Sequence, residues 1–186
     1  MVKKAVKFAE LAHKGAVRKG TRIPYITHPL ETAVIVASIT DDKEVIAAAV
    51  LHDVVEDAGV TEEEIKTQFG SRVAALVMAE SEDKSKSWQE RKSATLEHLK
   101  TASRDEKIIV LGDKLSNIRC TARDYLLQGE RFWERFNEKR KEMHGWYYEG
   151  VAKELKELEQ YPEYREYLQL CQMVFHSVNG LLGKET

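Results

Sequence analysis

The stretch LHDVVEDAG, residues 51–59, decides how this sequence is interpreted, because it adds four polar side chains to the end of an apolar run. The residues that lead into it, EVIAAAVL, have the composition of a buried helix. A charge taken out of water costs several kcal/mol unless a partner compensates it. The polar residues are His52, Asp53, Glu56 and Asp57. The rest of the chain must therefore provide a group that compensates them.

Length and composition favour one all-α domain. The chain has 186 residues, which suits a single domain, 1–186, with a sizeable core. Only three prolines and ten glycines interrupt it, so long helices are expected and a β-sandwich is not. The formal net charge is -2 and no basic block is present, which argues against nucleic acid as the main partner. A small anionic ligand needs only a few local cations and stays compatible with this composition.

The amino terminus and the cysteines indicate the compartment. The opening residues MVKKAVKFAELAHK form an amphipathic pattern with charges throughout, which is not that of a signal peptide. No apolar run approaches the ~18 residues needed to span a bilayer, so no membrane partner is expected. Cys120 and Cys171 lie far apart and outside any CxxC pattern, as expected for free thiols in a reducing compartment. The sequence therefore predicts a cytoplasmic protein.

Helical periodicity predicts helices along the chain and no strand. The first helix should end near Gly15, and Pro29 should open the second, which leaves His28 at its mouth. The third should begin at Asp41 or Asp42 and continue without a break to about Gly59. Further helices are expected over 61–70, 71–81, 88–102 and 104–120, followed by charged helical segments that break near Gly129 and Pro162.

Two capping boxes support these assignments. Thr61 with Glu64 marks the start of a short helix, and Ser103 with Glu106 marks the start of a longer one. The apolar run KIIVL, residues 107–111, could form a strand by composition alone. The capping box in front of it and the length of the periodic segment favour a helix.

The polar residues of 52–57 share one side of the predicted third helix, at about 100° per residue, and apolar residues fill the other. A solvated carboxylate face with an incidental histidine would give the same pattern. Asp113 favours a different interpretation, because apolar residues surround it and a buried aspartate needs a partner or a cation. A salt bridge to Lys107 or Arg119, or simple exposure, remains the alternative for Asp113.

Two histidines and two aspartates together form a candidate metal-binding set. The set is His28, His52, Asp53 and Asp113. Nitrogen and oxygen ligands of this kind suit Mn²⁺, Fe²⁺ or Zn²⁺ better than Ca²⁺, and the thiolates of a structural zinc site are absent from the set. A bound cation would compensate the buried aspartates and leave Glu56 and Asp57 free to handle a water molecule.

Several separated motifs resemble one enzyme family. HDVVEDAGVT, with PYITHP upstream and GDKLSNIR downstream, is similar to the HD-domain metal phosphohydrolases. RKGTRIPYITHP and SEDKSKSWQERK extend the similarity, over about residues 13–123, to the hydrolase domain of the RelA/SpoT family and its small alarmone hydrolases. The resemblance implies an all-helical HD-domain bundle. It also implies a Mn²⁺-dependent enzyme that removes the 3′-pyrophosphate from ppGpp or pppGpp, a small-molecule nucleotide substrate, and releases GDP or GTP.

The resemblance also implies roles for individual residues. The four candidate ligands, His28, His52, Asp53 and Asp113, match the Mn²⁺ ligands of the family. Glu56 and Asp57 match its paired acids, which position and deprotonate the attacking water. Arg18 and Lys19 match its Arg-Lys pair, with Arg18 against the guanine and Lys19 near phosphate, and Asn117 matches an asparagine that contacts the nucleotide. Arginine suits that position because its guanidinium stacks on a purine while its charge attracts phosphate; a solvated loop is the alternative.

Some features depart from the family pattern. Gly112 stands where relatives usually have alanine, Ala58 often replaces threonine, and Ser81 stands where threonine is common. Residues 129–150 match the family least, and we expect them to form an amphipathic helix with Trp133, Phe136 and Tyr147 buried. No synthetase-like region follows in the sequence, so a hydrolase without the opposing activity is expected.

Three other functions stay open at this point. A hydrolase of the same architecture could act on another nucleotide, such as NADPH, because the metal ligands do not determine which base is bound. A non-catalytic nucleotide-binding regulator would have lost Glu56 or Asp57, and both are present. A purely structural helical protein would not gather charge in an apolar helix. The oligomeric state is not encoded in any of these patterns.

Overall fold

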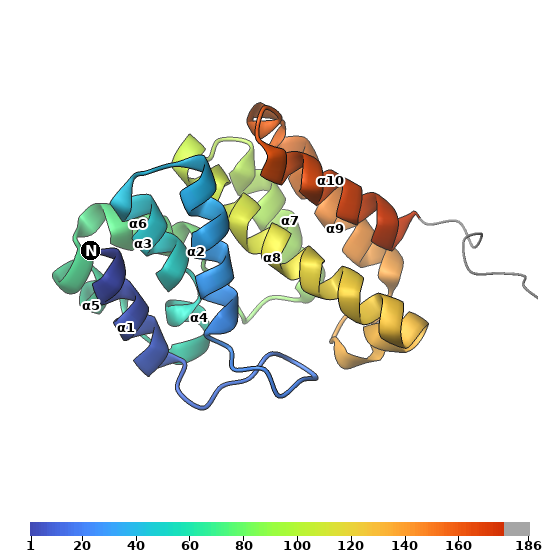
Figure 1. The fold of residues 1–186 in the computed structure, drawn as a ribbon, viewed down its shortest axis with the longest axis horizontal. Helices are drawn as coiled ribbons and strands as arrows, with labels where there is room; N and C mark the ends of the chain where they lie inside the picture. The colour runs from blue at the N-terminus through green and yellow to red at the C-terminus, as the bar shows by residue number, and fades with distance from the viewer. Residues whose placement is uncertain (177–186) are drawn as a thin grey trace, which may run out of the picture.

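The computed structural model describes residues 1–176, and helices make up nearly all of its regular structure (Figure 1). Within these residues the one extended pairing is an isolated bridge between Val17 and Pro24. No helix in this part of the chain has the length and apolarity to cross a membrane. The elements are α1 (Val2–Ala12), α2 (Thr27–Ile39), α3 (Lys43–Leu51), α4 (Val54–Ala58), α5 (Glu62–Phe69), α6 (Ser71–Glu80), α7 (Trp88–Leu99), α8 (Arg104–Gln128), the 3₁₀ turn η1 (Gly129–Arg135), α9 (Lys141–Glu154), the 3₁₀ turn η2 (Lys156–Leu158) and α10 (Pro162–Phe175).

The long helix α8 organises the bundle. It packs against α2 on one side and α10 on another, and it also touches α3, α6 and η1. In Figure 1, α1, α3, α5 and α6 lie at one end of the molecule, and α9 and α10 lie at the other. α8 is buried along much of its length, including Ile109, Leu111 and Leu115, which have no exposed surface. Any polar residue on its buried faces therefore has to find a partner inside the protein.

Gly112 allows α8 to approach α2 closely. A Cβ atom at this position would lie 2.8 Å from Cγ2 of Val36 and 3.1 Å from the carbonyl oxygen of Thr32. Contacts this short are sterically forbidden or nearly so, so a larger residue would push the two helices apart. The glycine thus brings the next residue, Asp113, close to the first turn of α2, where His28 lies.

The predicted continuous helix from Asp42 to Gly59 is wrong at its centre. The structure divides it into α3 and α4, with His52 and Asp53 at the junction. Asp53 has a flattened turn, with φ -96° and ψ -5°, and the Nδ1 atom of His52 lies 2.7 Å from the carbonyl oxygen of Ala49. The imidazole of His52 is thus hydrogen-bonded to a backbone carbonyl in the last turn of α3. All four polar residues nevertheless line one pocket, as the helical pattern predicted.

Two further expectations need correction. α2 begins at Thr27, so Pro29 is its third residue and His28 lies inside the first turn. The region 129–150 is not one amphipathic helix, because η1 ends at Arg135 and α9 starts only at Lys141. The predicted burial of aromatic side chains in this region is confirmed for Trp133 and Tyr147, both 3% exposed, but Phe136 is only half-buried.

The capping predictions agree with the structure. Both boxes form as predicted, and Asp42 caps α3 through backbone N–H groups of α3's first turn. A third box, formed by Ser87 and Glu90 at the start of α7, was not predicted. KIIVL lies inside α8, so the helical assignment of this run is confirmed.

Candidate metal centre and adjoining cavity

Four side chains from three regions of the chain meet at the centre of the bundle. Nε2 of His28 lies 3.1 Å from Oδ1 of Asp113 and 3.5 Å from Oδ2 of Asp53. Nε2 of His52 lies 3.0 Å from Oδ2 of Asp53 and 3.7 Å from Oδ1 of Asp113. Ligands roughly 2.1 Å from a shared ion stand roughly 3.0–3.4 Å apart. The spacing therefore fits one cation between these four side chains, and the ligand atoms of His28, His52 and Asp113 all lie within 4.8 Å of one another.

The state of His52 supports this fit. Its Nδ1 atom is taken by the Ala49 carbonyl, which can only accept a hydrogen bond, so Nδ1 carries the proton. Nε2 is buried and has no hydrogen-bond partner of its own. Nε2 is therefore the nitrogen that faces the carboxylates, with Oδ2 of Asp53 at 3.0 Å, and it can bind a cation once a proton held there is displaced.

The charges of the cluster also fit a cation. Burial alone would lower the pKa of His52, but the carboxylates of Asp53 and Asp113 raise it to about 10. Burial raises the pKa of Asp113, but Lys114 and the two histidines outweigh this and hold it well below its ordinary value. The site thus gathers negative charge that a proton or another cation must balance. A divalent ion would displace that proton and supply the same compensation.

The two acids of the HDVVED motif have different surroundings. Asp57 receives a hydrogen bond from Lys84 Nζ at 2.9 Å, and the Tyr25 hydroxyl lies 3.1 Å from its other oxygen. The same hydroxyl is 2.6 Å from Oδ2 of Asp53. Glu56 is more buried, and burial together with the nearby charge of Glu82 raises its pKa. Asp57 is therefore an exposed carboxylate, whereas Glu56 holds its proton to a higher pH than an ordinary glutamate.

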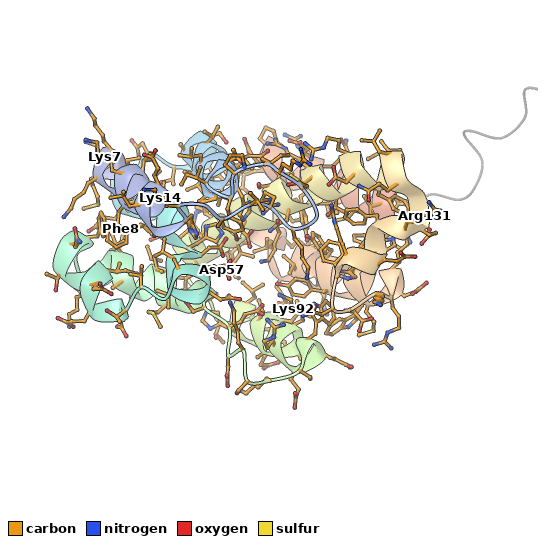
Figure 2. All side chains as sticks on the ribbon, turned by 90° about the horizontal axis from the view of Figure 1, so that it is seen from below. Lys7, Phe8, Lys14, Asp57, Lys92 and Arg131 are labelled. Carbon is orange, nitrogen blue, oxygen red and sulfur yellow. The ribbon has the colours of Figure 1, made fainter. Side chains whose placement is uncertain are left out.

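A cavity of about 550 Å³ adjoins the His/Asp cluster. The cluster pocket and this cavity share Arg18, Tyr25, His28, Lys92, Lys114 and Asn117 as lining residues. Figure 2 shows Asp57 of α4 and Lys92 of α7 near the middle of the molecule, between its two ends. The lining also includes the aromatic side chains of Trp88, Trp133, Phe136, His144, Tyr147, Tyr148 and Phe175. A lining that combines cationic and aromatic side chains suits a phosphorylated planar ligand.

The three predicted substrate contacts all line this cavity. Arg18 donates from its guanidinium to Oδ1 of Asn117 at 2.9 Å, and Asn117 donates to Oδ1 of Asp113 at 2.6 Å. The loop between α1 and α2 is thereby linked to α8 across 99 positions of sequence. Lys19 is exposed at the rim, with Nζ 5.8 Å from the ring centre of Phe136.

Several residues of the site were not predicted. Ser116 contacts His28, and Glu31 contacts Ser116. Each lies three positions after a predicted ligand, so the spacing of one helical turn could have identified them. Tyr25 lies in the turn before α2, so helical spacing does not connect it to the site. Lys84 comes from the loop before α7, and no local spacing connects it to the acid pair.

The fold and the site define a metal-dependent hydrolase: an all-helical bundle in which His28, His52 and Asp113 could hold a divalent cation, with Asp53 beside both histidines. The HD-domain family matches residues 5–132, which include all of these side chains. The chain belongs to the HD-domain family.

Curated relatives and solved structures agree with this assignment. Over 131 residues the chain is 40% identical to guanosine-3′,5′-bis(diphosphate) 3′-pyrophosphohydrolase MESH1 of Danio rerio, covering 66% of this chain and 72% of that protein. It is 37% identical over 114 residues to the guanosine-3′,5′-bis(diphosphate) 3′-pyrophosphohydrolase of Haemophilus influenzae, but this match covers only 17% of that longer protein and 58% of this chain.

Two solved structures share the fold over most of the chain. One is described as a metazoan ortholog of SpoT that hydrolyzes ppGpp; it has a TM-score of 0.76 and 27% identity and covers 92% of this chain and 93% of its own. The other is lmo0812 from Listeria monocytogenes, with a TM-score of 0.74 and 32% identity, covering 81% of this chain and 99% of that one. The likeness to both extends beyond the part that the HD-domain family matches in this chain.

Proposed function

We propose that this chain is a Mn²⁺-dependent hydrolase of ppGpp and pppGpp that removes the 3′-pyrophosphate and leaves GDP or GTP, acting as one domain in the cytoplasm. The observation that carries the proposal is the cavity of about 550 Å³ that shares its cationic lining with the His/Asp cluster. Relatives at about 40% identity that are named for this reaction support the choice of substrate.

In this proposal the metal ligands are His28, His52, Asp53 and Asp113. The bound Mn²⁺ would act as a Lewis acid on the scissile phosphate and make a water molecule more acidic. The histidines and aspartates come from α2, the α3–α4 junction and α8, so the bundle itself fixes their relative positions. They hold the ion only in the folded protein.

Glu56 and Asp57 are the proposed catalytic acids. Asp57, held by Tyr25 and Lys84, orients the attacking water through a carboxylate oxygen. Glu56, whose pKa is raised, takes the proton from that water and can return it to the leaving ribose oxygen. This division keeps one acid fixed in position and leaves the other, whose pKa is raised, to exchange a proton.

Arg18, Lys19 and Asn117 are the proposed substrate-binding residues. The guanidinium of Arg18 offers a flat face to the base, and its amide partner Asn117 keeps it over the cavity. Lys19 at the rim, with Lys92 and Lys114 deeper in the cavity, offsets the charge of the two pyrophosphate groups. The aromatic side chains of the lining complete a pocket for the nucleoside.

The experiment is pyrophosphate release from ppGpp by purified, metal-stripped protein, with and without Mn²⁺. We expect release only with Mn²⁺ and none from a Glu56→Ala/Asp57→Ala variant that still binds the ion. Chromatography of the products identifies GDP, which fixes the bond that is cut. A matched reaction with NADPH tests the rival substrate: turnover of NADPH without turnover of ppGpp would overturn the choice of nucleotide, and no turnover of either with Mn²⁺ bound would favour a non-catalytic regulator.

A further inference from the structure

A buried serine links the candidate metal ligand His28 to a carboxylate. Ser116 has no exposed surface, and its Oγ atom lies 2.8 Å from Nδ1 of His28 and 2.9 Å from Oε2 of Glu31. His28 is itself only 3% exposed. The two groups thus meet away from bulk solvent, and the direction of each hydrogen bond decides which nitrogen of His28 carries the proton.

The direction of the first bond follows from Glu31. A carboxylate only accepts hydrogen bonds, and its Oε1 atom already accepts from Arg119 at 3.1 Å. Arg119 is held in turn by two bonds of 2.7 Å to the oxygens of Glu166 on α10. The single hydroxyl proton of Ser116 must therefore go to Glu31.

The direction of the second bond follows from the first. Having donated its proton to Glu31, Ser116 has only lone pairs left for His28, so Nδ1 of His28 must be the donor. Nε2 then carries no proton and points its lone pair at the space between the aspartates. This is the tautomer that a metal requires.

Asp113 would favour the opposite tautomer if the serine were absent. Its Oδ1 atom lies 3.1 Å from Nε2 of His28 and would accept a proton placed there. A proton on Nε2 removes the lone pair that binds a cation. The identity of residue 116 thus decides between two tautomers, of which one can bind metal.

We propose that Ser116, oriented by Glu31, is a positioning residue that holds His28 in its metal-binding tautomer. The proposal rests on the metal-binding role proposed for His28. It assigns a function to two residues that lie one turn after the ligands on α2 and α8, and it ties the metal centre to α10, which lies outside the residues that the HD-domain family matches.

The test compares Ser116→Ala with Ser38→Ala for binding of Mn²⁺, measured by competition with a chromophoric chelator. Ser38 is the control, because its hydroxyl also lies within hydrogen-bond distance of a glutamate, Glu163 at 2.7 Å, but it is exposed near the end of α2, away from the metal ligands. We expect Ser116→Ala to weaken Mn²⁺ binding about 10–100-fold, and Ser38→Ala to leave it unchanged. Equal affinities for two folded variants would overturn the proposal.

A double-mutant cycle shows whether Glu31 acts through Ser116. Glu31→Ala alone should weaken Mn²⁺ binding, and it should add nothing in the Ser116→Ala background, because the residue it orients is already gone. Additive losses would show that Glu31 acts on the metal by another route and would overturn its proposed part.

The tautomer itself can be measured on the wild-type protein, so the proposal does not depend on the variants folding. Long-range ¹H–¹⁵N correlation spectra of the metal-free protein report which ring nitrogen of each histidine carries the proton, and a His28→Gln variant assigns the signal. We expect His28 to be protonated at Nδ1 with a contact to the Ser116 methylene. A proton on Nε2 would overturn the assignment. Absence of any metal binding by the wild type would instead contradict the proposed function.

Discussion

Two neighbouring carboxylates, Glu56 and Asp57, differ because different side chains face them. Tyr25 and Lys84 hydrogen-bond to Asp57, whereas Glu56 is more buried, lies near the negative charge of Glu82 and has Lys84 Nζ at 3.6 Å from its Oε1 atom. An acid that exchanges a proton at neutral pH works best when its pKa lies close to that pH. The surroundings therefore favour Glu56 as the proton carrier and Asp57 as the fixed carboxylate.

The raised pKa of Glu56 gives the first prediction. If Glu56 must be ionised to accept a proton, kcat/KM falls as the pH drops through this raised pKa, at a higher pH than for an ordinary glutamate. Glu82→Gln removes a negative charge that raises the pKa, so the acid limb of the pH profile should move to lower pH. Glu62→Gln, an exposed change on α5, should leave the profile where it is. A limb that does not move in Glu82→Gln would exclude Glu56 as the group that titrates.

Glu80 gives a prediction about stability. Burial raises its pKa from 4.5 to about 8. Between these two values the unfolded chain loses a proton that the folded chain keeps, so this group lowers the free energy of unfolding as pH rises through the window. Glu80→Gln removes this pH-dependent loss. The change that it makes to the free energy of unfolding of the metal-free protein should therefore be more favourable at pH 8 than at pH 5, by roughly 2–4 kcal/mol. Urea unfolding of both proteins at the two pH values, with a chelator present, measures the difference; the same effect at both would refute the raised pKa.

At the scale of elements, the contact between α2 and α8 depends on Gly112. Gly112→Ala gains about 1 kcal/mol of helix propensity, but the added methyl group meets Val36 and Thr32 at distances that cost about 1–3 kcal/mol. We expect net destabilisation and weaker Mn²⁺ binding, because Asp113 moves away from His28. Both effects can be followed by urea unfolding and chelator competition.

The partner and control variants make this prediction specific. Val36→Ala opens space beside Gly112, so the double variant should lose less stability than the sum of the two single changes. Gly145→Ala on α9 is the matched control, because its nearest contacts, atoms of Phe175, lie at 3.4 Å and tolerate a methyl group. Strict additivity, or an equal loss in Gly145→Ala, would show that the close approach of the two helices is not the cause.

Capping boxes and the apolar pattern predicted most helices, because these signals are local. The Thr61–Glu64 and Ser103–Glu106 boxes formed as predicted. The break at His52 was missed because the helical periodicity continues across it, whereas the flattened turn at Asp53 is seen only in the structure. The link from Arg18 to Asn117 was also out of reach, since no sequence spacing encodes a contact made across the fold.

The candidate site shows the same limit. The four proposed ligands were picked out by residue type and resemblance, and the structure brings them together. The residues that orient the ligands, Ser116 and Glu31, were not predicted, although each lies one turn after a ligand on the same helix. Residue type identifies a ligand, and one-turn spacing can suggest the residue that orients it, but only the hydrogen bonds in the structure show that it does so.

At the scale of the whole molecule, the proposed metal centre joins elements that are distant in sequence. Its side chains come from α2, the α3–α4 junction and α8, whereas the three tryptophans, Trp88, Trp133 and Trp146, lie on α7, η1 and α9. α8 contacts both α2 and α10, and α7 packs on α9. If the chain is one cooperative domain, a cation bound at the metal centre must stabilise the tryptophan-bearing elements as much as the helices that hold the cation.

The last prediction therefore concerns metal and cooperativity together. A ligand at 100 times its dissociation constant stabilises the folded state by about 2.7 kcal/mol, so Mn²⁺ at that excess should raise the free energy of unfolding by this amount and a chelator should reverse it. Helix content by circular dichroism and tryptophan fluorescence should shift together, because both report the same transition. Asp113→Asn should abolish the shift in both signals, since it removes one ligand's charge. If Mn²⁺ shifts the unfolding transition seen by circular dichroism but not the one seen by fluorescence, the elements that carry the tryptophans unfold as a separate unit, contrary to a single domain.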